Sequence, residues 1–229
     1  MPEIKLVIFD CDGVLVDSEY LAAQLEARRY GEHGFELSVT EFAGRFAGMT
    51  GEAIFDAINE ELGNTLPKGL QTEIDAELEE LLEEVKIVPG AAEVLDRFDQ
   101  PRCICSNSGS TRLQRMLKRT QLWDRFRPYV FSAKDLTPPA PKPKPDIFLR
   151  GMAKFGAGPR EAVVIEDSVH GVHAACAAGA RVIGFTGGKH SYPMHADMLS
   201  EAGAETVIAS FNDLPAVIEA FAAWDGFNL

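Results

Sequence analysis

From residue 88 onward the chain alternates between short apolar runs and amphipathic segments, which limits the folds it can adopt. The expected strands are residues 102–105, 129–131, 162–165, 181–185 and 206–209, separated by helical patterns that include residues 113–119, 146–155 and 169–178. Strands that are apolar throughout are buried on both faces, and helices that alternate with them cover those faces. The pattern therefore predicts an α/β fold with a doubly wound parallel sheet.

One further apolar run, at residues 4–9, ends in Asp10-Cys11-Asp12-Gly13. Because side chains alternate along a strand, Asp10 and Asp12 can project toward one point just beyond the strand end. Two carboxylates that converge in a partly desolvated cleft repel each other unless a cation lies between them or one stays protonated. Alone, the motif could equally be a polar turn with a helix cap. In a strand-end context it indicates a chemical site.

Residues 18–86 have a different pattern, with four helical segments joined by short connections. Thr40 and Thr50 are expected to cap the second and third helices, and Pro67 precedes an acidic helix whose charges are expected to form a solvated face. This is a small helical bundle inserted into the sheet domain, either a cap over an active site or a decorative insertion. We expect residues 1–17 and 87–229 to form the core and 18–86 the cap.

The formal net charge of −13 bears on possible partners. It argues against nucleic acid and anionic membrane surfaces, because binding to both depends on many Lys and Arg contacts. It does not exclude a small phosphorylated substrate held by a local cationic pocket. No apolar run is long enough to cross a membrane and no leader pattern opens the chain, so a cytoplasmic protein is expected, as a monomer or weak homo-oligomer. The four cysteines lack ligand spacing, which is typical of a reducing compartment.

Polar side chains follow three of the expected strands. They are Asp10 and Asp12, Ser106 and Asn107, and Glu166 and Asp167, while Lys142 lies in the proline-rich segment 137–145. Ligands of open parallel sheets bind at this edge of the sheet. Hard carboxylate oxygens suit a Mg²⁺ ion that keeps several waters and a phosphate oxygen, and short donors at a helix start suit phosphate. Each piece alone could be a capping or surface residue, but together they predict phosphoryl transfer.

With these residues in place, the sequence resembles the haloacid dehalogenase superfamily, in its first subfamily with a helical cap inserted after the first strand. The matching segments are residues 10–18, 106–108, 142–148, 164–168 and 171–179. They follow in order and span nearly the whole chain. The resemblance implies a Rossmann-like core and a place in the phosphoglucomutase and phosphoglycolate phosphatase-like branch. Within it, the chain looks most like bacterial phosphosugar phosphatases of the 6-phosphogluconate type.

The resemblance also implies a role for each matching residue. Asp10 would be the nucleophile that forms an aspartyl-phosphate, and Asp12 the general acid that later activates water. Ser106 would bind the phosphoryl group. Lys142, rather than Lys144, would neutralise charge. The implied Mg²⁺ ligands are Asp10, the backbone carbonyl of Asp12, and Asp167, with Glu166 assisting; Asn107 and Arg45 are candidate substrate contacts.

Three alternatives remain beside hydrolysis of a sugar phosphate or sugar-acid phosphate. Asp12 counts against dehalogenation, because dehalogenases of this superfamily lack it. β-Phosphoglucomutases carry a cap arginine where this chain has Gly51, although Arg45 could compensate. A phospho-accepting regulatory or binding module is disfavoured by Asp12 and by the large insertion. We therefore expect a Mg²⁺-dependent phosphatase.

Overall fold

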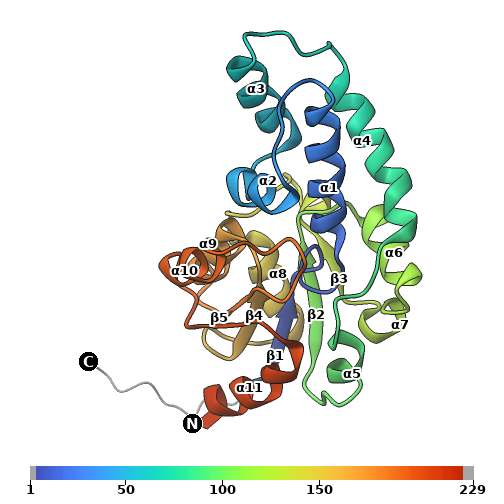
Figure 1. Ribbon diagram of the computed structural model, residues 1–229. Helices are drawn as coiled ribbons and strands as arrows, with labels where there is room; N and C mark the ends of the chain where they lie inside the picture. Colours follow the sequence, from blue (N-terminus) through green and yellow to red (C-terminus); the bar gives the residue numbers. More distant parts are fainter. Residues whose placement is uncertain (1–3, 224–229) are drawn as a thin grey trace.

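The computed structural model describes residues 4–223 and contains a six-stranded sheet (Figure 1). Its strands are β1 (Leu6–Phe9), β2 (Arg102–Ser106), β3 (Val130–Ser132), β4 (Ala162–Glu166), β5 (Arg181–Phe185) and β6 (Thr206–Ile208). Every neighbouring pair is parallel, and the spatial order is β3-β2-β1-β4-β5-β6. The strand order reverses at β1, which places the end of β1 at the switch point where open sheets bind ligands.

Helices cover both faces of this sheet, as the sequence predicted. Val7 and Phe9 of β1 point into one apolar cluster, whereas Leu6 and Ile8 point into the other. The first face is covered by α5 (Ala91–Leu95), α6 (Ser110–Arg119), α7 (Trp123–Phe126) and α11 (Leu214–Ala223). The second is covered by α8 (Asp146–Phe155), α9 (Val169–Ala177) and α10 (His195–Glu201). The α/β fold class is confirmed.

The segment after β1 forms helices α1 (Ser18–Gly31), α2 (Val39–Phe46), α3 (Gly51–Glu61) and α4 (Leu70–Leu81), followed by the short helix η1 (Leu82–Glu84). They lie together beyond one end of the sheet (Figure 1). They bury a third apolar cluster around Tyr30, Phe42 and Ile58. The two connections to the sheet lie side by side, because Asp17 N donates to Lys86 O (2.9 Å).

Two helix starts test the predicted caps. Thr50 caps α3 by accepting from Ala53 N (3.3 Å), as expected. The predicted cap at Thr40 is wrong, because Ser38 caps α2. The Ser38 hydroxyl accepts from Glu41 N (3.3 Å), and the Glu41 carboxylate accepts from Ser38 N (2.9 Å). This reciprocal pair satisfies two otherwise unpaired N–H groups, which gives it the advantage over Thr40.

The acidic helix α4 is less solvated than the sequence suggested. Glu77 forms an ion pair with Arg29 of α1 (2.8 Å), and Glu79 forms ion pairs with Arg112 and Arg115 of α6. Such partly exposed pairs each contribute about 0.2–1 kcal/mol. Their main consequence is geometric, because they connect α4 both to its own bundle and to a helix of the sheet domain.

Two further points concern the expectations. None of the helices within residues 4–223 is long and apolar enough to span a membrane. Trp224, one of the two tryptophans in the chain, lies outside the described residues.

Candidate active site

A cavity of about 710 Å³ lies between the end of the sheet and the α1–α4 bundle. Its sheet side is lined by residues that follow β1, β2 and β4, and its opposite wall comes from all four bundle helices. The structure brings together six of the sequence-predicted residues along it: Asp10, Asp12, Ser106, Asn107, Lys142 and Asp167. Segments that are far apart in the sequence therefore meet at one site.

Asp10 is the residue directly after β1. Its backbone N–H donates to Ile165 O (3.0 Å), so the pairing of β1 with β4 continues to this position and fixes it. The side chain is buried, and its carboxylate accepts a hydrogen bond from the Lys142 ammonium. Burial raises the pKa of Asp10, Lys142 opposes that effect, and the neighbouring Glu166 and Asp167 carboxylates add to it. The carboxylate oxygens of Asp10 are therefore poorly solvated.

Lys142 lies between two buried carboxylates. Its side chain is 3% exposed, its Nζ contacts Asp10, and it donates to Glu166 Oε1 (2.5 Å). Burial opposes the ammonium charge, but the two carboxylates outweigh it and raise the pKa of Lys142. The ammonium therefore stays charged. It also lies 5.0 Å from the centroid of the Phe148 ring, whose face favours a cation.

Asn107 holds the backbone of Lys142. Its Oδ1 accepts from Lys142 N (2.8 Å), and its Nδ2 donates to Lys142 O (3.4 Å). The sequence suggested a substrate contact at Asn107. The structure instead shows both ends of its amide engaged with the loop that carries the lysine.

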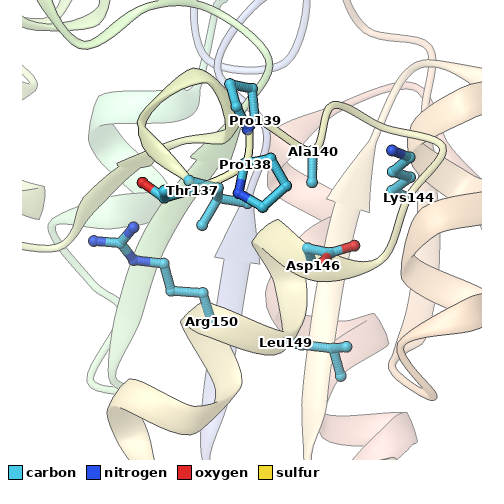
Figure 2. Close-up of a pocket in the computed structure, with 9 residues that line it drawn as sticks. Thr137, Pro138, Pro139, Ala140, Lys144, Asp146, Leu149 and Arg150 are labelled. Atoms are coloured by element: carbon cyan, nitrogen blue, oxygen red, sulfur yellow. The ribbon is translucent and has the colours of Figure 1, made fainter.

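Lys144, the neighbouring lysine, lies elsewhere. It lines a separate hollow of about 400 Å³ on the outside of the proline-rich loop, together with Pro138, Pro139 and Arg150 (Figure 2). Only Lys142 lines the cavity among these two lysines of the loop. The geometry therefore agrees with the choice of Lys142.

Asp12 is held by two hydroxyl groups. Ser18 Oγ donates to Asp12 Oδ1 (2.8 Å), and Ser106 Oγ donates to Asp12 Oδ2 (3.1 Å). Ser106 Oγ in turn accepts from Ser108 N (3.0 Å). Since Ser18 begins α1 and Ser106 ends β2, the orientation of this carboxyl depends on both the bundle and the sheet.

Two histidines that sequence analysis missed hold Asp167. His190 Nε2 lies 2.9 Å from Asp167 Oδ2, and His195 Nε2 donates to Asp167 O (2.6 Å). Burial opposes a charge on His190, but the hydrogen bond to the Asp167 carboxylate outweighs it and raises the pKa. Both histidines lie after β5, in a segment without a recognisable motif. The one sequence signal for these histidines is that they follow β5, whose carboxyl end lies at the same edge of the sheet as those of β1 and β4.

Gly13 is required by a close approach. It has φ +76°, and a Cβ at this position would lie 1.9 Å from Asp167 Oδ2. No other residue allows the turn after Asp12 to pass so near Asp167. The glycine of the Asp10-Cys11-Asp12-Gly13 motif therefore brings the β1 and β4 carboxylates together.

Arg45, a predicted substrate contact, is not brought to the cavity in this structure. Arg45 lies outside the described residues that line the cavity and pairs with Glu61. Its guanidinium is 5.1 Å from the Phe35 ring centroid and 5.3 Å from that of Phe46. The ion pair and the two aromatic faces together keep this cation within the bundle.

Glu166, predicted as an assisting metal ligand, has both carboxylate oxygens engaged by protein donors. It is fully buried and is absent from the described lining of the cavity. Oε1 accepts from Lys142, and Oε2 accepts from Ser168 Oγ (3.0 Å) and Ser168 N (3.2 Å). With both oxygens engaged by protein donors, Glu166 is placed to orient Lys142.

The donor set fits a magnesium ion. Asp10, Asp12 and Asp167 line the cavity and the buried Glu166 adds a further carboxylate, whereas Lys142 pairs with only Asp10 and Glu166 of these four. Such an excess of negative charge is stabilised by a cation. Within residues 4–223 no group of three or more His, Cys, Asp or Glu side chains is arranged to hold a metal. Mg²⁺ needs fewer, because it commonly binds one or two carboxylates and keeps waters and phosphate oxygens.

Comparison with known proteins identifies the family. The family model for haloacid dehalogenase-like hydrolases matches residues 4–179. The chain belongs to this family. As predicted, it is a hydrolase of the phosphoric monoester type.

Three relatives of this hydrolase are informative. The 6-phosphogluconate phosphatase of Escherichia coli K12 is 29% identical over 199 residues, covering 85% of this chain and 88% of that protein. A conserved haloacid dehalogenase-like protein from Agrobacterium tumefaciens is 54% identical with a TM-score of 0.93, covering 96% of this chain and 99% of that one. A family hydrolase from Deinococcus radiodurans, solved with bound phosphate and sodium, is 29% identical with a TM-score of 0.85, covering 98% and 99%.

Proposed function

We propose that this hydrolase is a Mg²⁺-dependent phosphatase that acts on a small sugar phosphate or sugar-acid phosphate through an aspartyl-phosphate on Asp10. One observation carries the proposal. Asp10, ion-paired with Lys142, lies in the same cavity as Asp12, whose carboxyl is held by the Ser106 hydroxyl. A nucleophile, a proton donor and a phosphate-binding hydroxyl are thus assembled at one point. The phosphatase relative in Escherichia coli supports the substrate class.

In the first step, an Asp10 carboxylate oxygen attacks phosphorus and the bond from phosphorus to the leaving oxygen breaks. Asp12 gives its proton to the leaving oxygen, which departs as an alcohol. Burial raises the pKa of Asp10, and the ion pair with Lys142 favours its ionised form against that effect. The Ser106 hydroxyl, which donates to Asp12 in this structure, would turn to donate to a phosphoryl oxygen when substrate binds.

In the second step, water attacks the phosphorus of the aspartyl-phosphate while Asp12, now ionised, accepts a proton from that water. The bond from phosphorus to Asp10 breaks, which releases inorganic phosphate and regenerates both aspartates. The same carboxyl must therefore donate and then accept. Its two serine partners, Ser18 and Ser106, suit this change because a hydroxyl can donate or accept.

We assign the metal ligands to Asp10, Asp167 and the backbone carbonyl of Asp12. When bound, Mg²⁺ would supply charge neutralisation for the phosphoryl oxygens as they approach these carboxylates. Glu166 acts as the residue that positions Lys142, which its two protein-bound oxygens support. His190 contacts the Asp167 carboxylate and His195 donates to the Asp167 carbonyl, so the two histidines orient this proposed ligand.

We further propose that residues 18–86 are a cap domain on a core of residues 1–17 and 87–229. The separate apolar cluster of the bundle and its paired connections near Asp17 and Lys86 support this division. A cap that closes over the cavity excludes bulk water and strengthens the charge interactions inside it. Its opening would admit water and release product.

A mutase is less compatible with the cap wall. Gly51 stands where mutases of this branch carry an arginine, and a Cβ there would lie 2.4 Å from Gln71 Nε2. A long cationic side chain has no room at that position unless Gln71 moves, and Arg45 is held by Glu61. Nothing in this wall replaces the missing cation for a second phosphate, which favours simple hydrolysis.

The test is phosphate release from a panel of sugar phosphates and sugar-acid phosphates, with Mg²⁺ and with chelator. We expect Mg²⁺-dependent release and loss of all turnover in Asp10→Asn, whose amide is a poor nucleophile. Near-normal turnover in Asp10→Asn would exclude the covalent mechanism. Conversion of glucose 1-phosphate to glucose 6-phosphate in the presence of a bisphosphate primer, without net release, would assign a mutase.

A further inference from the structure

The two walls of the cavity differ in the charged side chains that they carry. The wall formed by α1–α4 contributes three acidic side chains, Glu19, Glu26 and Asp75, and its described lining residues include no lysine, arginine or histidine. The reacting aspartates lie on the opposite, sheet side. A leaving group on a phosphoryl group at Asp10 would extend from the sheet side into the cavity, whose opposite wall includes these three acids.

Helix α1 places two of these acids, Glu19 and Glu26, at different distances from Asp12. Ser18 contacts Asp12, and Glu19 follows it directly. Glu26 lies seven residues further along the same helix, roughly 10 Å away along its axis. Ala22 and Ala23, which also line the cavity, leave open space between the two carboxylates. The wall therefore offers acceptors at two distances from the reacting centre.

Asp75 of α4 is held in place by a relay of hydrogen bonds. The buried Tyr30 donates from its hydroxyl to Gln71 Oε1 (2.7 Å), and Gln71 Nε2 donates to Asp75 Oδ1 (2.8 Å). No hydrogen-bond partner within residues 4–223 engages Asp75 Oδ2, Glu19 or Glu26. These carboxylates face the cavity with acceptor capacity to spare.

The charges around the wall do not cancel. Burial raises the pKa of Glu19 to about 7; Asp12 and Asp167 add to the effect, and His190 and Arg112 oppose it. Burial also raises the pKa of Glu26 to about 8, with Glu19 and Asp75 adding to it. With these pKa values, both carboxyls are ionised above about pH 8, and there a second anion would be repelled.

Of the cations on the sheet side, His190 and Arg112 lower the pKa of Glu19, but neither is named among the groups that shift the pKa of Glu26. Lys142 is engaged by Asp10 and Glu166, and Arg112 by Glu79. Lys134 and His170 line the cavity from the sheet domain. An anionic end group that points toward Glu26 therefore meets no cation on its own wall.

We propose that Glu19, Glu26 and Asp75 select the leaving group: they accept hydrogen bonds from a polyol, or an ion pair from an amine, and reject a second anion. The inference rests on the proposed function and narrows it, since it favours a sugar phosphate over a sugar-acid phosphate. It also separates this chain from its relative that acts on 6-phosphogluconate.

The test uses three open-chain six-carbon 6-phosphates that differ only at C1: 6-phosphogluconate (carboxylate), sorbitol 6-phosphate (alcohol) and 1-amino-1-deoxysorbitol 6-phosphate (ammonium). We expect kcat/KM to be about tenfold or more higher for the alcohol and the ammonium than for the carboxylate. At a pH above about 8, where Glu26 is ionised, Glu26→Gln removes its charge without changing its shape and should reduce that ratio several-fold. Glu60→Gln, an exposed acid of α3 outside the cavity lining, is the matched control and should leave the ratio unchanged.

The outcomes separate this inference from the function it rests on. No phosphate release from any of the three compounds or from the wider panel would overturn the proposed phosphatase. Release with 6-phosphogluconate as the best substrate would leave the phosphatase standing and overturn the selection by the acidic wall. The same holds if Glu26→Gln shifts the ratio no more than Glu60→Gln does.

Discussion

Replacing Lys142 by methionine removes the one ammonium that lies between two buried carboxylates. The Lys142 side chain is 3% exposed, that of Asp10 is 9% exposed and that of Glu166 is fully buried. Removing one partner of a buried ion pair costs about 3–5 kcal/mol, because the remaining charge is left uncompensated. Since domains are stable by about 5–15 kcal/mol, the variant should fold with reduced stability.

The loss of stability in Lys142→Met should be larger at high pH than at low pH. Without Lys142, the folded-state pKa values of Asp10 and Glu166 lie above the unfolded values of about 3.9 and 4.3. The folded state then binds more protons than the unfolded state, so stability present at low pH is lost as the pH rises through the folded pKa values. The deficit relative to wild type should be near its full value at about pH 8 and smaller at about pH 5.

The assay is urea unfolding followed by circular dichroism in the presence of chelator at both pH values. Lys144→Met, an exposed lysine on the same loop, is the control and should change the free energy of unfolding by less than about 0.5 kcal/mol. Lys142→Met combined with Glu166→Gln should recover part of the loss, because only one of the two carboxylates that contacted Lys142 remains. If Lys142→Met lowers the free energy of unfolding equally at both pH values, or does not lower it, this account of Lys142, Asp10 and Glu166 is refuted.

Other predictions concern the residues around the cavity. Arg45→Ala should change kcat/KM by less than about twofold, because its guanidinium lies on Glu61 outside the cavity lining; a larger loss would return Arg45 to the site. His195→Phe should weaken Mg²⁺ binding by about tenfold or more in calorimetry, since it removes the hydrogen bond to Asp167 O. Gly13→Ala should lose both turnover and Mg²⁺ binding, because its Cβ would lie 1.9 Å from Asp167 Oδ2; unchanged Mg²⁺ affinity in either variant would count against these contacts.

Much of the fold follows from local patterns in the sequence. Strands such as residues 162–166 are apolar throughout, and a buried parallel strand has little alternative conformation once helices flank it. The same sheet edge then collects whatever follows the strands, which is why Asp10, Ser106 and Asp167 could be grouped before their positions were known.

The remaining features depend on contacts that no local pattern encodes. His190 and His195 reach Asp167 only because the segment after β5 returns to the site, and their spacing resembles no motif. Arg45 has the charge of a phosphate contact, but the aromatic faces of Phe35 and Phe46 and the ion pair with Glu61 decide where it lies.

The direction in which acidic side chains of a helix point is a second feature that the sequence did not predict. In a sequence, acids on an amphipathic helix indicate a face toward solvent. In the structure, Glu26 faces the cavity, whereas Glu77 and Glu79 pair with arginines of α1 and α6. The direction of such a helix face depends on how the bundle docks on the sheet, which is a tertiary property.

The central claim, a covalent intermediate on Asp10, can be tested by rapid acid quenching during turnover of a sugar phosphate, followed by peptide mapping by mass spectrometry. The account predicts that the peptide containing Asp10 gains the mass of one phosphoryl group early in turnover, and that Asp10→Asn shows no such gain. A burst of phosphate release without a phosphorylated peptide, or a phosphoryl group on another residue, would contradict it.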